Sequence, residues 1–128
     1  MDKKYIIDSS AFLAAIYDEN SNFDFESFIP DSAMHVVNLS EVLAVLLRDG
    51  MQKSMAKQIV QSNISEILNS STEEAVLAAD IRIRNREYGI STGDSFCLAA
   101  AKLHKCDVLT ADKIWNKLDL DIKIINVR

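Results

Sequence analysis

Short apolar runs alternate with longer amphipathic stretches along the whole chain. The runs are rich in Ile, Val and Leu and have the length of strands, at residues 4–7, 34–37, 64–68, 107–109 and 122–127. The stretches between them repeat apolar residues at helical spacing, at residues 9–17, 51–62, 71–88, 93–104 and 112–118, with a further helix that follows Asn38 and stops near Gly50. This alternation predicts an α/β fold: a mostly parallel central sheet of four or five short strands with helices on both faces.

Three segments carry more specific expectations. Residues 18–31 are polar apart from three phenylalanines and end near Pro30, so we expect a loop with one helical turn. A methionine stripe in the 51–62 helix predicts a core face, or alternatively a helix–helix or dimer surface. In the 71–88 helix, an apolar set falls on one face: Val76, Ala79 and Ile83.

Composition limits the protein class without identifying it. A length of 128 residues with 48% apolar residues predicts one domain over residues 1–128. The chain lacks a signal-peptide pattern and any run of about 20 apolar residues, so we expect a cytoplasmic protein without a membrane contact. The two cysteines, Cys97 and Cys106, have no C-x-x-C spacing and are expected to be free thiols.

Charge argues against one way of binding nucleic acid. With 14 Lys and Arg against 19 Asp and Glu, the net charge is −5, which does not suit a protein that holds nucleic acid by a broad basic field. A cluster of carboxylates that binds divalent ions is partly neutralised, however. Without four such acids the net charge would be −5 + 4 = −1.

Four acids fall at or near the strand ends where open α/β sheets place their sites. They are Asp8 after the first strand, Glu41 in the first turn of the next helix, Asp94 at the start of the 93–104 helix, and Asp112. Each also suits helix capping; Asn38 and Glu41 form an N-x-x-E pattern similar to a capping box. Four carboxylates in one crevice would repel each other without cations, and oxygen ligands without His or Cys favour Mg²⁺ or Mn²⁺ over zinc.

Other catalytic designs find little support. His35 is expected inside a strand and His104 near a helix end, and neither has a nucleophile and an orienting acid at a recognisable spacing. With three glycines in the chain, there is no Gly-rich phosphate loop.

Four motifs in order resemble the PIN domain, and within it the VapC-type toxins of toxin–antitoxin pairs. The first is Ile6-Ile7-Asp8-Ser9-Ser10. The second, Ser40-Glu41-Val42-Leu43, opens an apolar helix. The others are an Asp that opens an Ala-rich helix, at residues 94–101, and a Leu-x-Thr-x-Asp segment with a following aromatic residue, at residues 109–115.

The resemblance implies a three-layer PIN-like fold and a metal-dependent endoribonuclease. Asp8, Glu41, Asp94 and Asp112 would hold one or two Mg²⁺ or Mn²⁺ ions, and a metal-activated water would leave a 5′-phosphate and a 3′-hydroxyl. Ser10 and Thr110 would orient these carboxylates or a bound water, although both hydroxyls also suit helix capping.

The resemblance also suggests partners. The RNA phosphates would meet nearby basic side chains, of which the best placed are Arg82, Arg86 and Lys113, with Arg84 and Lys117 as weaker candidates. Trp115 would anchor the core or stack on a base. Relatives of the toxin type imply a homodimer and a cognate antitoxin whose C-terminal segment lies across the groove.

Some residues depart from the family pattern, and other functions stay open. Gly93 and the bulky Phe96 flank Asp94 where a small or apolar pair is expected. A haloacid-dehalogenase-type phosphatase needs a second Asp where Ser10 stands, and a receiver domain needs an acidic pair after the first strand. A catalytically silent PIN-like binding or dimerisation module, or a housekeeping RNA-processing PIN nuclease, remains the alternative.

Overall fold

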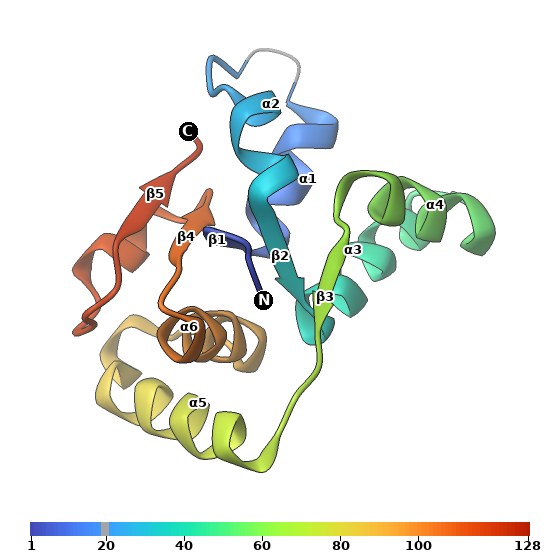
Figure 1. Cartoon of the computed structure of the whole chain (residues 1–128). Coiled ribbons are helices and arrows are strands. Elements are labelled where there is room, and N and C mark those ends of the chain that lie inside the picture. The colour runs from blue at the N-terminus through green and yellow to red at the C-terminus, as the bar shows by residue number, and fades with distance from the viewer. Residues whose placement is uncertain (19–20) are drawn as a thin grey trace.

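The computed structural model, which describes residues 1–18 and 21–128, contains a five-stranded parallel sheet at its centre (Figure 1). Its strands, in spatial order, are β3 (Glu66–Leu68), β2 (Ser32–His35), β1 (Tyr5–Ile7), β4 (Asp107–Thr110) and β5 (Ile124–Asn126). Every neighbouring pair runs parallel. This confirms the predicted α/β class and the parallel sheet, and it places the central strands β1 and β4 side by side.

Helices cover both faces of the sheet, because successive strand residues point to opposite sides. In β1, Ile6 belongs to the core on the side of α6 (Thr92–His104), which α5 (Thr72–Arg84) also lines. Its neighbour Ile7 belongs to the opposite core, together with α1 (Ser9–Tyr17), α3 (Val36–Arg48) and α4 (Lys53–Asn63). Figure 1 shows α5 and α6 together on one side of the strands. The predicted three-layer arrangement is therefore present.

Helix α6 is buried on nearly all sides between the sheet and α5. Residues 97–101, which include three consecutive alanines, are completely inaccessible to solvent. A helix without a polar face must be enclosed by other elements, and small side chains let the sheet and α5 come close to it. The helix ends at His104, where Lys105 takes a left-handed conformation with φ 55°.

The predicted strand 34–37 is shifted by two residues. Strand β2 spans Ser32–His35, and Val36 and Val37 already belong to α3. The His35 side chain accepts a hydrogen bond from the Val37 backbone N–H, which caps the helix there. Glu41 is consequently the sixth residue of α3, one turn later than predicted, and Asn38 lies inside the helix and is not its cap.

The predicted apolar face of α5 is wrong, and the methionine stripe is only partly a core face, because Met51 packs against the core whereas Met55 does not. In α5 the buried residues are Glu74, Ala78 and Ile81, whereas Val76 and Ile83 are 67% and 61% exposed. The helix ends at Arg84 and a short 3-10 turn, Arg86–Tyr88, carries the chain to Gly89. In α4 the core contact comes from Ala56 and Val60, and Met55 is 56% exposed.

The remaining segments agree with the sequence in type, and their ends differ by a few residues. Between α1 and β2 lie α2 (Phe25–Phe28) and a 3-10 turn (Ile29–Asp31); residues 19 and 20 of the predicted loop lie outside the described residues. The helix expected after Asp112 is a 3-10 helix, Lys113–Lys117. In the described part of the chain, no helix is long and apolar enough to cross a membrane.

Candidate acidic site

Asp8 lies at the carboxyl end of β1 and is almost entirely buried, with 3% of its surface exposed. Its Oδ1 accepts hydrogen bonds from the Ala11 backbone N–H at 2.9 Å and from the Ser10 hydroxyl at 2.8 Å. Its Oδ2 accepts a hydrogen bond from the Thr110 hydroxyl at 2.9 Å. Asp8 therefore caps α1, as its position predicts, and the same carboxylate reaches across to the end of β4.

Ser10 and Thr110 connect Asp8 to the segment that follows β4. The Ser10 hydroxyl accepts from the Ala111 backbone N–H at 3.0 Å, and the Thr110 hydroxyl accepts from the Asp112 backbone N–H at 3.0 Å. Each hydroxyl thus accepts a hydrogen bond from this segment and donates one to Asp8. The two hydroxyls fix the orientation of the Asp8 carboxylate relative to Asp112.

Glu41 projects from α3 toward the first turn of α6. Its Oε1 accepts hydrogen bonds from the Ser9 hydroxyl at 3.1 Å and from the Asn38 amide at 2.8 Å. A methyl group added to Gly93 would lie 2.7 Å from the Glu41 Cδ and Oε1 atoms, closer than atoms can approach. Gly93 departs from the family pattern, and this contact gives a physical reason: the Glu41 carboxylate occupies the space that a side chain at position 93 would need.

Asp94 begins α6 within a capping box. Its backbone N–H donates to the Ser91 hydroxyl at 3.1 Å, and its Oδ2 accepts from the Ser91 backbone N–H at 2.9 Å. Asp112 is exposed and caps the following 3-10 helix by accepting from the Ile114 N–H at 3.0 Å. Capping and site formation are thus compatible, because one carboxylate oxygen of each acid suffices for the cap.

The acids influence one another electrostatically. Burial raises the pKa of Asp8 to about 7, and the charge on Asp94 adds to that rise against the lowering effect of the three hydrogen bonds. The pKa of Asp94 is raised by burial and then by the charges on Glu41 and Asp112. The charge on Asp94 therefore acts on Asp8, and the charges on Glu41 and Asp112 act on Asp94.

Cys97 lies in the core close enough to the acids for their charges to affect its thiol. Its thiol is completely buried, and burial raises its pKa well above the ordinary value, with further contributions from Asp8, Asp94 and Glu41. Both cysteines are free and buried, as predicted. Because the thiol is completely buried in the core between the sheet and α5, Cys97 acts as a packing residue.

The donor set suits a hard divalent cation. Oδ1 of Asp94, Oε2 of Glu41 and Oδ2 of Asp112 accept no hydrogen bond from any described residue, so these three acids each keep an oxygen available, whereas both oxygens of Asp8 already accept hydrogen bonds. As the side chains are placed within residues 1–18 and 21–128, no three His, Cys, Asp or Glu groups are close enough together to enclose an ion. Four like charges without a cation between them repel each other.

The basic residues divide into two groups. Arg82 donates to the Thr92 hydroxyl at 2.9 Å, in the first turn of α6, and lines with Arg86 a surface hollow of about 480 Å³. Arg84 instead pairs with Asp80 and Asp119 on another side of the helix. Lys113 is exposed directly after Asp112. Trp115 is 1% exposed, so its ring is a core anchor and is not available to stack on a base.

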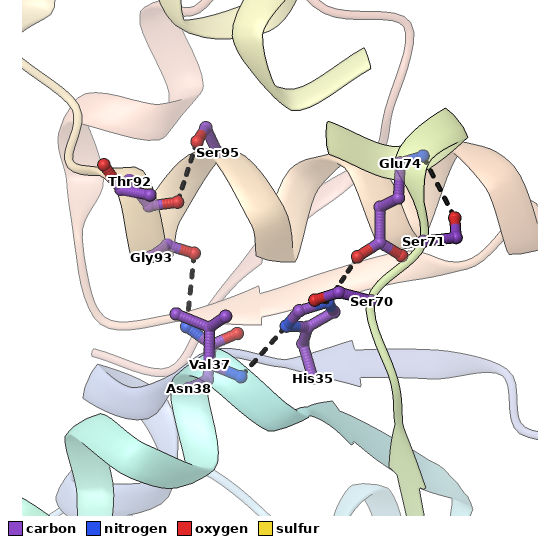
Figure 2. A network of polar contacts seen from close by, with 9 residues as sticks. All are labelled: His35, Val37, Asn38, Ser70, Ser71, Glu74, Thr92, Gly93 and Ser95. Carbon is purple, nitrogen blue, oxygen red and sulfur yellow. Dashed lines mark hydrogen bonds and ion pairs between the residues drawn. The ribbon is translucent and has the colours of Figure 1, made fainter. Parts of the chain in front are cut away.

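One polar network beside the acids is not predicted by the sequence pattern (Figure 2). His35 Nε2 contacts the Glu74 carboxylate in the interior, where both side chains are nearly inaccessible, and Phe96 packs against the His35 ring at 5.3 Å between centroids. Glu74 is 39 residues from His35, and the sequence suggests only that it is an acid in the first turn of α5. Sequence spacing therefore could not pair it with His35. The pair joins β2 to α5, and Phe96 is accommodated there.

Comparisons with known proteins give the family. The PIN domain model matches residues 5–120. Sequence comparison with curated proteins finds no significant match. Among solved structures, a chain of the DNA-bound VapBC complex from Salmonella typhimurium superposes with a TM-score of 0.76 at 16% identity, over 98% of this chain and 99% of that one.

Two further solved structures share the fold with similar TM-scores and similarly low sequence identity. A chain of a toxin–antitoxin complex from Klebsiella pneumoniae gives a TM-score of 0.72 at 16% identity, over 97% of this chain and 98% of that one. VapC20 from Mycobacterium tuberculosis, described as a sarcin-ricin loop cleaving toxin, gives 0.71 at 15% identity, over 88% and 93%. The family model matches residues 5–120, and the three-layer fold with its parallel sheet agrees with that match. The chain belongs to the PIN domain family.

Proposed function

We propose that this protein is a metal-dependent endoribonuclease and the toxin of a type II toxin–antitoxin pair. The observation that carries the proposal is the set of contacts that brings the four acids together in a PIN-domain fold: Thr110 links Asp8 to Asp112, and the Glu41 carboxylate lies against Gly93, the residue before Asp94. Structural neighbours that belong to toxin–antitoxin complexes support the second half of the proposal.

The four acids would hold one or two Mg²⁺ or Mn²⁺ ions. When bound, such an ion activates the attacking water and offsets the charge that develops on the phosphate. The chain itself contributes orientation: Ser10 and Thr110 hold Asp8, and the Ser91 cap holds Asp94. Arg82, Arg86 and Lys113 would bind RNA phosphates without reading sequence.

An antitoxin and a second copy of the chain are the proposed partners. The structural neighbours include VapBC and FitAB assemblies, several of them bound to DNA. A protein of this acidity is not expected to bind DNA by itself, so DNA contact would come from the partner.

Cleavage of a single-stranded RNA by the purified protein tests the activity. We expect cleavage with Mg²⁺ or Mn²⁺, none with EDTA, and products that carry a 5′-phosphate. Asp94→Asn should reduce the rate by a factor on the order of 10² or more, because removal of one ligand charge weakens the ion.

Asp107→Asn is the matched control, because Asp107 begins β4 at the end opposite to Asp112 and should leave the rate unchanged. Equal cleavage by wild type and the Asp94 variant would contradict the site assignment. Absence of cleavage by wild-type protein with either metal would favour a catalytically silent PIN module, to which the present spread of the carboxylates lends some support.

A further inference from the structure

Asn38 lies between two of the four acids. It is the third residue of α3, 1% exposed, and its amide nitrogen is 2.8 Å from Glu41 Oε1 and 3.2 Å from the Gly93 carbonyl oxygen. Figure 2 shows Asn38 directed at Gly93 in the first turn of α6. Both neighbours are acceptors only, so the side chain must present its NH₂ group to them. The two amide protons therefore link Glu41 to the backbone beside Asp94.

The other end of the same amide is unsatisfied. The Asn38 Oδ1 atom is buried and has no hydrogen-bond partner among the described residues. An unpaired buried acceptor costs about 1–3 kcal/mol, whereas a leucine of similar size would avoid that cost. Stability alone therefore does not account for an amide at this position, and its two donated hydrogen bonds indicate a different role.

Glu41 is confined from both sides as a result. Asn38 holds its Oε1 on one side, and on the other its carboxylate lies against Gly93, where no side chain can be added without a clash. Because the Asn38 amide also holds the Gly93 carbonyl, the spacing between α3 and the start of α6 is fixed at the point where the Glu41 carboxylate lies against the residue before Asp94.

We propose that Asn38 is a positioning residue that fixes the Glu41 carboxylate against the first turn of α6 and so sets the spacing of Glu41 and Asp94 for a shared divalent cation. The inference rests on the proposed function. Asn38 does not itself bind the ion; it acts through Glu41, in the way that hydrogen-bonded neighbours of metal ligands tune metal affinity elsewhere.

Titration of the purified protein with Mn²⁺ by calorimetry measures this role without any RNA. We expect Asn38→Leu to raise the Kd for Mn²⁺ by about 10–100-fold, the usual effect of removing a group that orients a ligand. Asn85→Leu is the matched control, because Asn85 is equally buried and also donates to a backbone carbonyl, that of Ile81, but contacts none of the four acids. It should leave the Kd unchanged in the folded protein.

The same substitution in a Glu41→Gln protein distinguishes positioning of Glu41 from a general loss of structure. In Glu41→Gln protein, which should itself bind Mn²⁺ weakly, Asn38→Leu is expected to add no further loss, because its effect passes through the Glu41 carboxylate. Multiplicative losses in the double variant would overturn the inference. An unchanged Kd in Asn38→Leu, when Glu41→Gln weakens binding, would also overturn it while leaving the proposed function intact.

Two further results bear on the inference: no binding of Mn²⁺ by the wild-type protein, and failure of Asn38→Leu to fold. Absence of Mn²⁺ binding to the wild-type protein would contradict the proposed function and the inference with it. If Asn38→Leu does not fold, Gly93→Ala tests the same contact, because its methyl group would displace the Glu41 carboxylate. It is expected to raise the Kd for Mn²⁺, and an unchanged Kd in the folded Gly93 variant would contradict the role given to this contact.

Discussion

Asp8 is at once the N-cap of α1 and the most deeply buried of the four acids. Its pKa of about 7 means that the folded state binds a proton more tightly than the unfolded chain, whose aspartates have the ordinary value of 3.8. The stability that protonation supplies is complete below about pH 4 and is lost as the pH rises through 7. A buried carboxylate thus makes the metal-free protein less stable at neutral and higher pH.

Asp8→Asn should therefore stabilise the metal-free protein at pH 8. A rise of roughly three pKa units corresponds to about 4 kcal/mol at most, and the lost hydrogen bonds will reduce the gain. Denaturant unfolding in EDTA between pH 4 and 8 measures this: wild type should weaken with rising pH and approach the variant at pH 4. The exposed Asp2→Asn is the control. A variant much less stable than wild type at pH 8 would show that the cap outweighs the charge.

Helix α6 is the element that carries Asp94 to the strand ends. Its alanines at positions 99–101 are fully enclosed by the sheet and α5, so the helix can approach both closely. The Ser91 capping box fixes where this helix begins, and thereby the place of Asp94. The position of Asp94 thus depends on packing along the whole helix, beyond its own hydrogen bonds.

Ala100→Leu tests that dependence. The added atoms have no space, and overpacking of this kind costs about 1–3 kcal/mol. We expect a lower denaturation midpoint and a weaker Mn²⁺ affinity in the folded variant, because the start of α6 must shift. Val76→Leu on the exposed face of α5 should change neither quantity. If Ala100→Leu matched wild type in both measurements, the close packing of α6 would have no bearing on the site.

At the scale of the whole molecule, a net charge of −5 must be reconciled with the proposed RNA substrate. The arginines of α5 and of the turn that follows it have different surroundings. Arg82 and Arg86 line one hollow, and Arg82 also donates to Thr92 in the first turn of α6. Arg84 is paired with Asp80 and Asp119. RNA contact is expected to be local and confined to the cationic side that leads to the acids.

Arg82→Ala should weaken the binding of single-stranded RNA and lower the salt dependence of log Kd by about 0.7, the contribution of one phosphate contact. Arg84→Ala is the matched control, because its charge is already paired. Fluorescence anisotropy in Ca²⁺ at several salt concentrations, with the non-cleaving Asp94→Asn background, measures both. Equal losses from the two variants would contradict a phosphate site at Arg82.

The sequence by itself determined the α/β alternation, the parallel sheet and three of the four acids at strand or helix ends; Glu41 lies one turn farther into α3 than the sequence predicts. Asp8 and Asp112 could be placed because each directly follows a run whose apolar character is local. The PIN resemblance followed from ordered motifs, and the family match over residues 5–120 confirms it. These features depend on short-range patterns, which the order of residues contains directly.

Tertiary structure decided which faces are buried and which polar groups meet. The apolar face of α5 points outward because packing against α6 selects Ala78 and Ile81, and periodicity cannot say which side a neighbouring helix will cover. The His35 contact with Glu74, and the Asn38 link between Glu41 and Gly93, join residues 39 and 55 positions apart through β2, α3, α5 and α6. Such contacts arise only when the layers pack, so local sequence spacing gives no sign of them.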